Sequence, residues 1–137
     1  MPSDFDDMTV ITALMQDRAL ASYRRTLEEE VSLRQELGEI EQLRIAALHR
    51  DSQDIARRVT GADGLWQGWI ARRRTGLNQE LAMLQIRKSA QRTLAQTAFA
   101  RNQVAEELAK GDNTQKNRRR EAMLDQRLRD ACSGFTE

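Results

Sequence analysis

The chain has 137 residues, a formal net charge of +1, 31% charged residues and only six aromatic residues. This composition is typical of coiled coils and long helices, and it excludes a large aromatic-rich core. There is no apolar run of transmembrane length and no leader-like N-terminus, so we expect a cytoplasmic protein. Cys132 is the only cysteine, which excludes an internal disulfide and a zinc site of several thiolates.

Two proline-free helical patterns occupy most of the chain, over residues 8–59 and 65–110. The segment 60–64 between them contains Gly61 and Gly64, which suit the end of one helix and the start of the next. Because the two patterns have similar lengths, the sequence predicts an all-α fold. We expect residues 1–110 to form a long antiparallel two-helix coiled-coil hairpin with its bend at residues 60–64.

The apolar stripe of the first pattern changes phase. One register contains Leu20, Tyr23 and Leu27, and after Val31 a second one contains Leu33, Leu37 and Ile40. This change predicts a stutter in the coiled coil.

Folding the chain about the bend predicts the register of the hairpin, because facing residue numbers then sum to about 125. Residues 1–60 have a net charge of −4 and residues 61–137 one of +5, which favours the antiparallel pairing. The rule places Asp51 and Asp54 beside Arg72–Arg74. It also predicts the apolar pairs Ile55–Ile70, Leu48–Leu77, Ile40–Leu84, Val31–Leu94, Leu27–Ala98 and Leu20–Val104.

The bend contains the two tryptophans, Trp66 and Trp69, followed by Arg72, Arg73 and Arg74. Either tryptophan can close the open end of the hairpin or serve as a binding anchor, since Trp beside Arg is frequent at interface hot spots. We expect Trp69 to support the hairpin and Trp66 to be the anchor. The sequence therefore predicts a partner-binding tip formed by these five residues.

The second pattern is strongest at Leu77, Leu81 and Leu84. It is diluted at Lys88, Gln91 and Ala95, and we expect Phe99, Val104 and Leu108 to restore it. The middle of the hairpin should therefore be its least stable part.

Residues 111–137 form a basic C-terminal extension. Gly111 to Thr114 predict a helix stop, and residues 116–131 a short helix with Met123, Leu124 and Leu128 on one side. Arg118, Arg119 and Arg120 begin this helix and are a candidate partner-binding tail, although a solvated face is the more common outcome. Residues 133–137 have no helical pattern, so we expect the tail to be partly disordered.

No catalytic, metal or cofactor site is predicted. His49 is the only histidine, and the run Glu28 to Glu30 predicts a solvated face because consecutive helical side chains point about 100° apart. The glycines lack the strand and lysine of a phosphate loop. We therefore expect no enzyme activity, no cofactor and no small-molecule substrate. Nucleic-acid binding through the arginines at the bend is disfavoured by the acidic residues among them.

The second pattern resembles bacterial flagellar type III export stalk proteins of the FliJ type and the related stalk proteins of virulence secretion. The resemblance rests on Trp66-Gln67-Gly68-Trp69-Ile70-Ala71-Arg72-Arg73-Arg74, on Leu77-Asn78-Gln79-Glu80-Leu81-Ala82 and on Ala98-Phe99-Ala100-Arg101. It covers about 45 residues of this pattern. It implies a small antiparallel coiled coil whose paired termini enter a hexameric export ATPase and whose bend contacts the export gate. It also implies a location at the cytoplasmic face of the inner membrane, reached through these partners.

Two other functions fit the same pattern. One is a coiled-coil regulator that binds nucleic acid or a polymerase, and the other is a general coiled-coil scaffold in which chains pair with each other. Salt-sensitive binding to nucleic acid or polymerase distinguishes the first, and a stable oligomer of the chain alone distinguishes the second.

Overall fold

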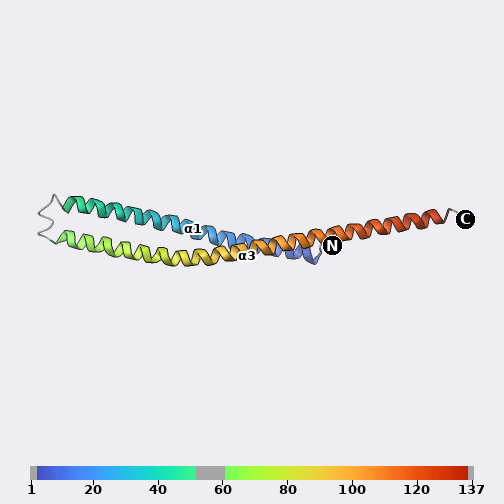
Figure 1. The fold of residues 1–137 in the computed structure, drawn as a ribbon, viewed down its shortest axis with the longest axis horizontal. Helices are drawn as coiled ribbons and strands as arrows, with labels where there is room; N and C mark the ends of the chain where they lie inside the picture. Colours follow the sequence, from blue (N-terminus) through green and yellow to red (C-terminus); the bar gives the residue numbers. More distant parts are fainter. Residues whose placement is uncertain (1–2, 52–60, 136–137) are drawn as a thin grey trace. The chain divides into compact units, whose positions relative to one another are not determined.

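The computed structural model describes residues 3–51 and 61–135, and these form two long helices. Helix α1 spans Asp4–Asp51 and helix α3 spans Ala62–Ser133 (Figure 1). Thr12 contacts Asn102 and Thr26 contacts Gln91, so the two helices are antiparallel. The predicted all-α helical hairpin is confirmed. Neither helix is long and apolar enough to cross a membrane within the described residues.

The helix boundaries differ from the predicted ones. Helix α1 already begins at Asp4, where Ser3 and Asp6 form a reciprocal cap: the Ser3 amide donates to Asp6 Oδ2 at 3.1 Å and the Asp6 amide donates to Ser3 Oγ at 3.2 Å. Gly61 has a φ of 71°, the left-handed conformation expected of a bend glycine. Gly64, however, lies inside α3. The first predicted helix ends at residue 59, but residues 52–60 lie outside the described residues.

The predicted helix stop at residues 111–114 is wrong, because α3 continues through Gly111 to Ser133. Glycine in a helix costs about 1 kcal/mol relative to alanine, which local contacts can offset. Here Lys116 pairs with Asp112 at 3.2 Å, and the Thr114 hydroxyl donates to the Lys110 carbonyl at 2.9 Å. Residues 111–133 of the basic extension therefore continue α3, and residues 134 and 135 form a turn.

Both helices have an unbroken heptad seam, which is the set of positions that face the other helix. The seam of α1 alternates steps of four and three residues, and its members are buried or half-buried: Phe5, Thr9, Thr12, Gln16, Ala19, Tyr23, Thr26, Glu30, Leu33, Leu37 and Ile40. The predicted stutter is wrong because the polar residues Thr26 and Glu30 occupy seam positions. Val31, which suggested the phase change, is 66% exposed.

The seam of α3 keeps the same alternation from Ile70 to Asp112. Its members are Ile70, Arg74, Leu77, Leu81, Leu84, Lys88, Gln91, Ala95, Ala98, Asn102, Ala105, Ala109 and Asp112, all buried or half-buried. Lys88, Gln91 and Ala95 thus dilute the seam, as predicted. Phe99, Val104 and Leu108 do not restore it, because all three are exposed and the seam passes instead through alanines and Asn102.

The predicted register is wrong. Facing residue numbers sum to about 115 rather than about 125, as the pairs Thr12–Asn102 and Glu30–Lys88 show. The predicted partner of Ile40 is Leu84, but Ile40 packs with Ile70 and Leu77. The predicted partner of Leu48 is Leu77, but Leu48 lines a groove with Ile70. The prediction was centred on residues 62 and 63, but these already belong to α3. The predicted partner Ile55 lies outside the described residues.

The hairpin divides into two compact units. Unit 1 contains Met1–Ala19 and Ala95–Glu137, and unit 2 contains Leu20–Leu94. Both units include a part of α1 and a part of α3. In unit 2, Ile40, Ile70 and Leu77 form a buried apolar cluster with Leu33, Leu37 and Ala47 packed against it, and Leu84 is buried as well.

Candidate functional site: interaction surfaces

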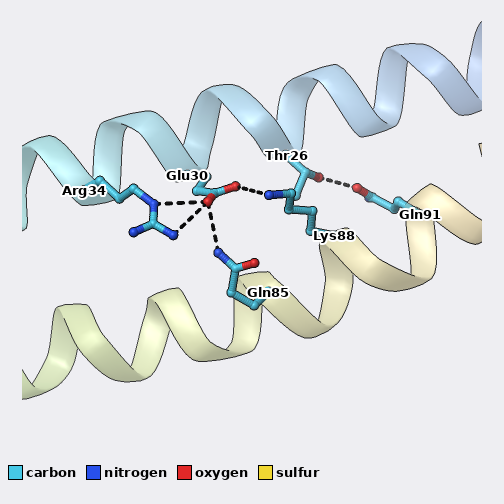
Figure 2. A network of polar contacts seen from close by, with 6 residues as sticks. All are labelled: Thr26, Glu30, Arg34, Gln85, Lys88 and Gln91. Atoms are coloured by element: carbon cyan, nitrogen blue, oxygen red, sulfur yellow. Dashed lines mark hydrogen bonds and ion pairs between the residues drawn. The ribbon is translucent and has the colours of Figure 1, made fainter.

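Four seam residues of unit 2 and the neighbouring Gln85 form a group of hydrogen-bonded polar residues, the polar layer, which consists of Thr26, Glu30, Gln85, Lys88 and Gln91 (Figure 2). Lys88 Nζ lies 2.8 Å from Glu30 Oε2, and Gln85 Nε2 donates to Glu30 Oε1 at 3.0 Å. The Thr26 hydroxyl donates to the Gln91 side-chain carbonyl. Each contact joins α1 to α3, so the layer ties the two helices together in one register.

Glu30 is the electrostatic centre of the polar layer. Hydrogen bonds from Lys88, then Gln85, then Arg34 lower the pKa of Glu30 from 4.5 to about 2, against the opposing effect of its burial. Arg34 contributes from the same helix, with Nε at 3.1 Å and Nη2 at 3.0 Å from Oε1. The carboxylate is therefore charged at neutral pH and has donors on both of its oxygens.

The run Glu28 to Glu30 does not form a single solvated face as predicted. Glu30 is buried in the seam, whereas Glu29 is exposed and pairs with Arg87 of α3, and Glu28 is exposed. The expected divergence of consecutive carboxylates is observed, since Glu29 and Glu30 contact different partners. The polar layer itself was missed by the sequence analysis. Continuing one heptad register through Thr26 and Glu30 would have revealed it.

Near the bend, the structure brings Trp66 and Trp69 together. Their rings stack with centroids 5.3 Å apart and planes inclined by 16°, and the two residues are 44% and 45% exposed. The expected difference between a core Trp69 and an exposed Trp66 is therefore wrong, because the two rings cover each other to a similar extent. The buried residue in this part of α3 is Ile70, which follows Trp69 and is 2% exposed.

The three predicted tip arginines have different surroundings. Arg73 Nη2 lies 2.7 Å from Glu36 Oε2, and Arg74 pairs with Glu41. These carboxylates replace the predicted partners Asp51 and Asp54, whose side chains lie outside the described part of the chain. Arg72 is exposed. Of the three predicted arginines, Arg72 is thus the one that forms no ion pair within the described residues.

In unit 1 the seam is small and polar. Ala95, Asn102 and Ala105 are buried in α3. Thr12 is hydrogen-bonded to Asn102 Oδ1 at 3.0 Å, and the Thr9 hydroxyl lies 3.4 Å from the Ala105 carbonyl oxygen. Small side chains at the seam let two helices approach closely, but they bury little apolar area.

Apart from Phe5, which lies in the seam, the large apolar side chains of unit 1 point away from it. We call Met8, Val10, Ile11, Leu14 and Met15 of α1 the outer face, and all five are exposed. In α3 of the same unit, Phe99, Val104 and Leu108 are also exposed. Large exposed apolar residues beside a seam of small and polar residues reverse the usual helix-pair pattern, and contiguous exposed apolar surface is typical of interaction sites.

Residues 113–133 of α3 form a helical segment with no helix beside it in unit 1, and every residue in it is exposed (Figure 1). This segment is the helical part of the basic C-terminal residues 111–137, and from here on we call residues 113–133 the extension. It contains the predicted tail residues Arg118, Arg119 and Arg120, which lie on three different sides of one helix because they are consecutive. Met123, Leu124 and Leu128 are its exposed apolar residues.

The described residues contain no group of three or more His, Cys, Asp or Glu side chains arranged to hold a metal ion. The free thiol of Cys132 is exposed on the extension. Unit 2 has grooves between the helices, one of them bordered by Arg44, Leu48 and Ile70.

Comparisons with protein-family models, with curated proteins and with solved structures give no match.

Proposed function

We propose that the chain is a non-enzymatic central stalk of a type III protein export ATPase, of the flagellar or the virulence kind. In this function the end of the hairpin that carries the chain termini enters a hexameric ATPase, and the residues next to the bend contact an export gate. The observation that carries the proposal is the composition of unit 1, in which small and polar residues dominate the seam and Met8, Ile11 and Leu14 are exposed. A helix pair with an apolar exterior is suited to enclosure by a surrounding protein.

The resemblance of residues 66–101 to FliJ-like stalks supports the same function. The stacked pair Trp66 and Trp69, together with the exposed Arg72, supplies an aromatic and cationic surface of the kind found at interface hot spots. The nucleic-acid alternative is weaker, because Arg73 and Arg74 are already paired with Glu36 and Glu41.

The proposal is tested with the full chain and the purified export ATPase encoded in the same genome. We expect the chain to bind the ATPase and to stimulate its ATP hydrolysis. The Ile11→Glu/Leu14→Glu variant should bind at least about tenfold more weakly, since it places two charges on the outer face. Ile86→Glu is the matched control, because Ile86 is 74% exposed but lies in unit 2. Equal binding by all three proteins, or no binding by any, would overturn the assignment of this surface to the ATPase.

The gate contact is tested separately. Replacing both Trp66 and Trp69 with Ala should weaken binding to the cytoplasmic domain of the export gate while ATPase stimulation is retained. The melting temperature should change little, because the two rings cover mainly each other. Normal gate binding by this double variant would contradict the tip assignment.

A further inference from the structure

Unit 1 has two exposed surfaces whose patterns match each other. The outer face follows an acidic first turn, Asp4, Asp6 and Asp7. The extension has a basic stretch, Lys116 and Arg118–Arg120, followed by its apolar residues. In both segments a cluster of like charges precedes the apolar group along the chain, and in the extension Asp125 and Arg127, of opposite charge, lie between Leu124 and Leu128.

The spacing also agrees. In each segment the centre of the apolar group lies about two helical turns after the centre of the charged group. A parallel alignment of the two helices therefore brings basic residues beside acidic ones and apolar residues beside apolar ones. An antiparallel alignment would place each charged group beside an apolar one.

The extension cannot make this contact within its own chain. The seam of α3 ends at Asp112. Lys116, one turn further along, is close enough to Asp6 at the start of α1 for its charge to contribute to the lowered pKa of that carboxyl group. Beyond that point the rigid helix leads away from residues 8–15 of the same chain, as the ribbon of unit 1 shows (Figure 1). A second chain that meets the first end to end has its α1 running parallel to the extension, because α1 and α3 are antiparallel within each chain.

We propose that two copies of this chain form a symmetric dimer in which the extension of each copy covers the outer face of the other. Each extension then forms a three-helix packing with α1 and α3 of the partner's unit 1. Leu124 and Leu128 lie against the partner's outer face, and Arg118–Arg120 lie beside the partner's acidic first turn. The contact is isologous and closes on itself, so it produces a dimer and not a filament.

This inference does not rest on the proposed function. The dimer covers the surface that we assign to the ATPase ring, so the two associations exclude each other. If an experiment excludes the dimer, the contact with the ATPase can still be tested by its own experiment, and the reverse also holds.

The first experiment is sedimentation velocity of the full chain, without any partner, up to about 100 μM. We expect a dimer that dissociates as salt concentration rises, because part of the contact is between exposed charges. Leu124→Glu/Leu128→Glu and Ile11→Glu/Leu14→Glu should each shift the dissociation constant upward at least about tenfold. Ile86→Glu, on the exposed surface of unit 2, should remain as dimeric as the unmodified chain. Circular dichroism should show equal helix content in all four proteins, since every replaced side chain is exposed.

The second experiment is complementation between the two double variants. The intact extension of one variant can still cover the intact outer face of the other, so a mixture should form heterodimers at concentrations where each variant alone is monomeric. A monomeric unmodified chain overturns the proposal. So does a dimer that both double variants preserve, or a mixture that behaves as two separate monomers.

Discussion

The seam of unit 2 and the seam of unit 1 follow the same heptad spacing with different chemistry. Unit 2 combines an apolar core at Ile40, Ile70 and Leu77 with the polar layer around Glu30. Unit 1 has alanines, threonines and Asn102 at the equivalent positions and exposes its large apolar residues. Heptad spacing thus sets which positions face each other, whereas the residues at those positions decide how much stability each unit contributes by itself.

The difference teaches how one hairpin can combine stability with binding. Unit 2 buries its apolar side chains within the chain and has specific polar contacts that select one register. Unit 1 leaves its apolar area for association with other molecules. We therefore expect unit 2 to be the more stable unit when the chain is a monomer, and unit 1 to gain stability when its outer face is covered.

The largest expected effect is in the core of unit 2. Leu77 is 1% exposed, so Leu77→Ala should destabilise the chain by about 2–5 kcal/mol through lost burial and the cavity left behind. Urea denaturation followed by circular dichroism measures this loss. Leu65→Ala is the matched control, since Leu65 is 76% exposed, and its effect should stay within about 0.5 kcal/mol. Similar losses for both variants would contradict the assigned core.

A change of the opposite kind should disrupt unit 1. Ala105 is 2% exposed between the helices, so Ala105→Leu should force them apart at a cost of about 1–3 kcal/mol. Hydrogen exchange should then increase in residues 4–19 and remain unchanged around Leu77. The control is Val104→Leu at the neighbouring exposed position. If Ala105→Leu instead slows exchange, the close approach of the helices in unit 1 is wrong.

Glu30 should make the stability of unit 2 depend on pH. Its pKa in the folded chain is about 2, below the ordinary value of 4.5, so its stabilising contribution is fully present above about pH 4.5 and is lost as the pH falls toward 2. Melting temperatures measured across this interval should fall less steeply for Glu30→Gln than for the unmodified chain. Glu28→Gln is the control at an exposed position. Parallel pH profiles for Glu30→Gln and the unmodified chain would show that the carboxylate has no special role.

The smallest expected effect is at the start of α1. Ser3→Ala removes one half of the reciprocal cap with Asp6 and should cost about 1 kcal/mol of local helix stability. The amide of Asp6 should exchange faster, while Ser3→Thr should retain its protection. The pKa of Asp6 is lowered mainly by the Ser3 backbone hydrogen bond, so it should rise only in part when the hydroxyl is removed. Nuclear magnetic resonance titration measures both quantities.

The sequence predicts the architecture well because the architecture depends on repeated features. The absence of proline between residues 3 and 137, the glycine at position 61 and the alternating seam all favour a helical hairpin, and the structure has one. The dilution of the α3 seam at Lys88, Gln91 and Ala95 was also predicted. These features are local or periodic, so a single chain reveals them.

Register and boundaries were not predictable by the same reasoning. Apolar pairing alone favours a register in which Leu48 faces Leu77. It cannot exclude this register, because many apolar residues still face each other when the sum of facing residue numbers changes from about 115 to about 125. The contacts that distinguish the registers are polar, namely Thr26 with Gln91 and Glu30 with Lys88. Gly111 suggested a helix end, but isolated glycine is only a weak signal when neighbouring residues make helical contacts. The stacking of Trp66 on Trp69 was compatible with their spacing, yet spacing could not show that neither ring belongs to the core.

The central claim is that the hairpin has the register in which Thr26 faces Gln91 and Glu30 faces Lys88, and intrachain disulfide formation tests it most directly. In a Cys132→Ser background, cysteines at positions 26 and 91 should form an intrachain disulfide rapidly, because Thr26 and Gln91 are in direct contact. Cysteines at positions 48 and 77, which the apolar pairing rule placed together, should not. Efficient intrachain crosslinking of 48 with 77, together with none between 26 and 91, would contradict this register.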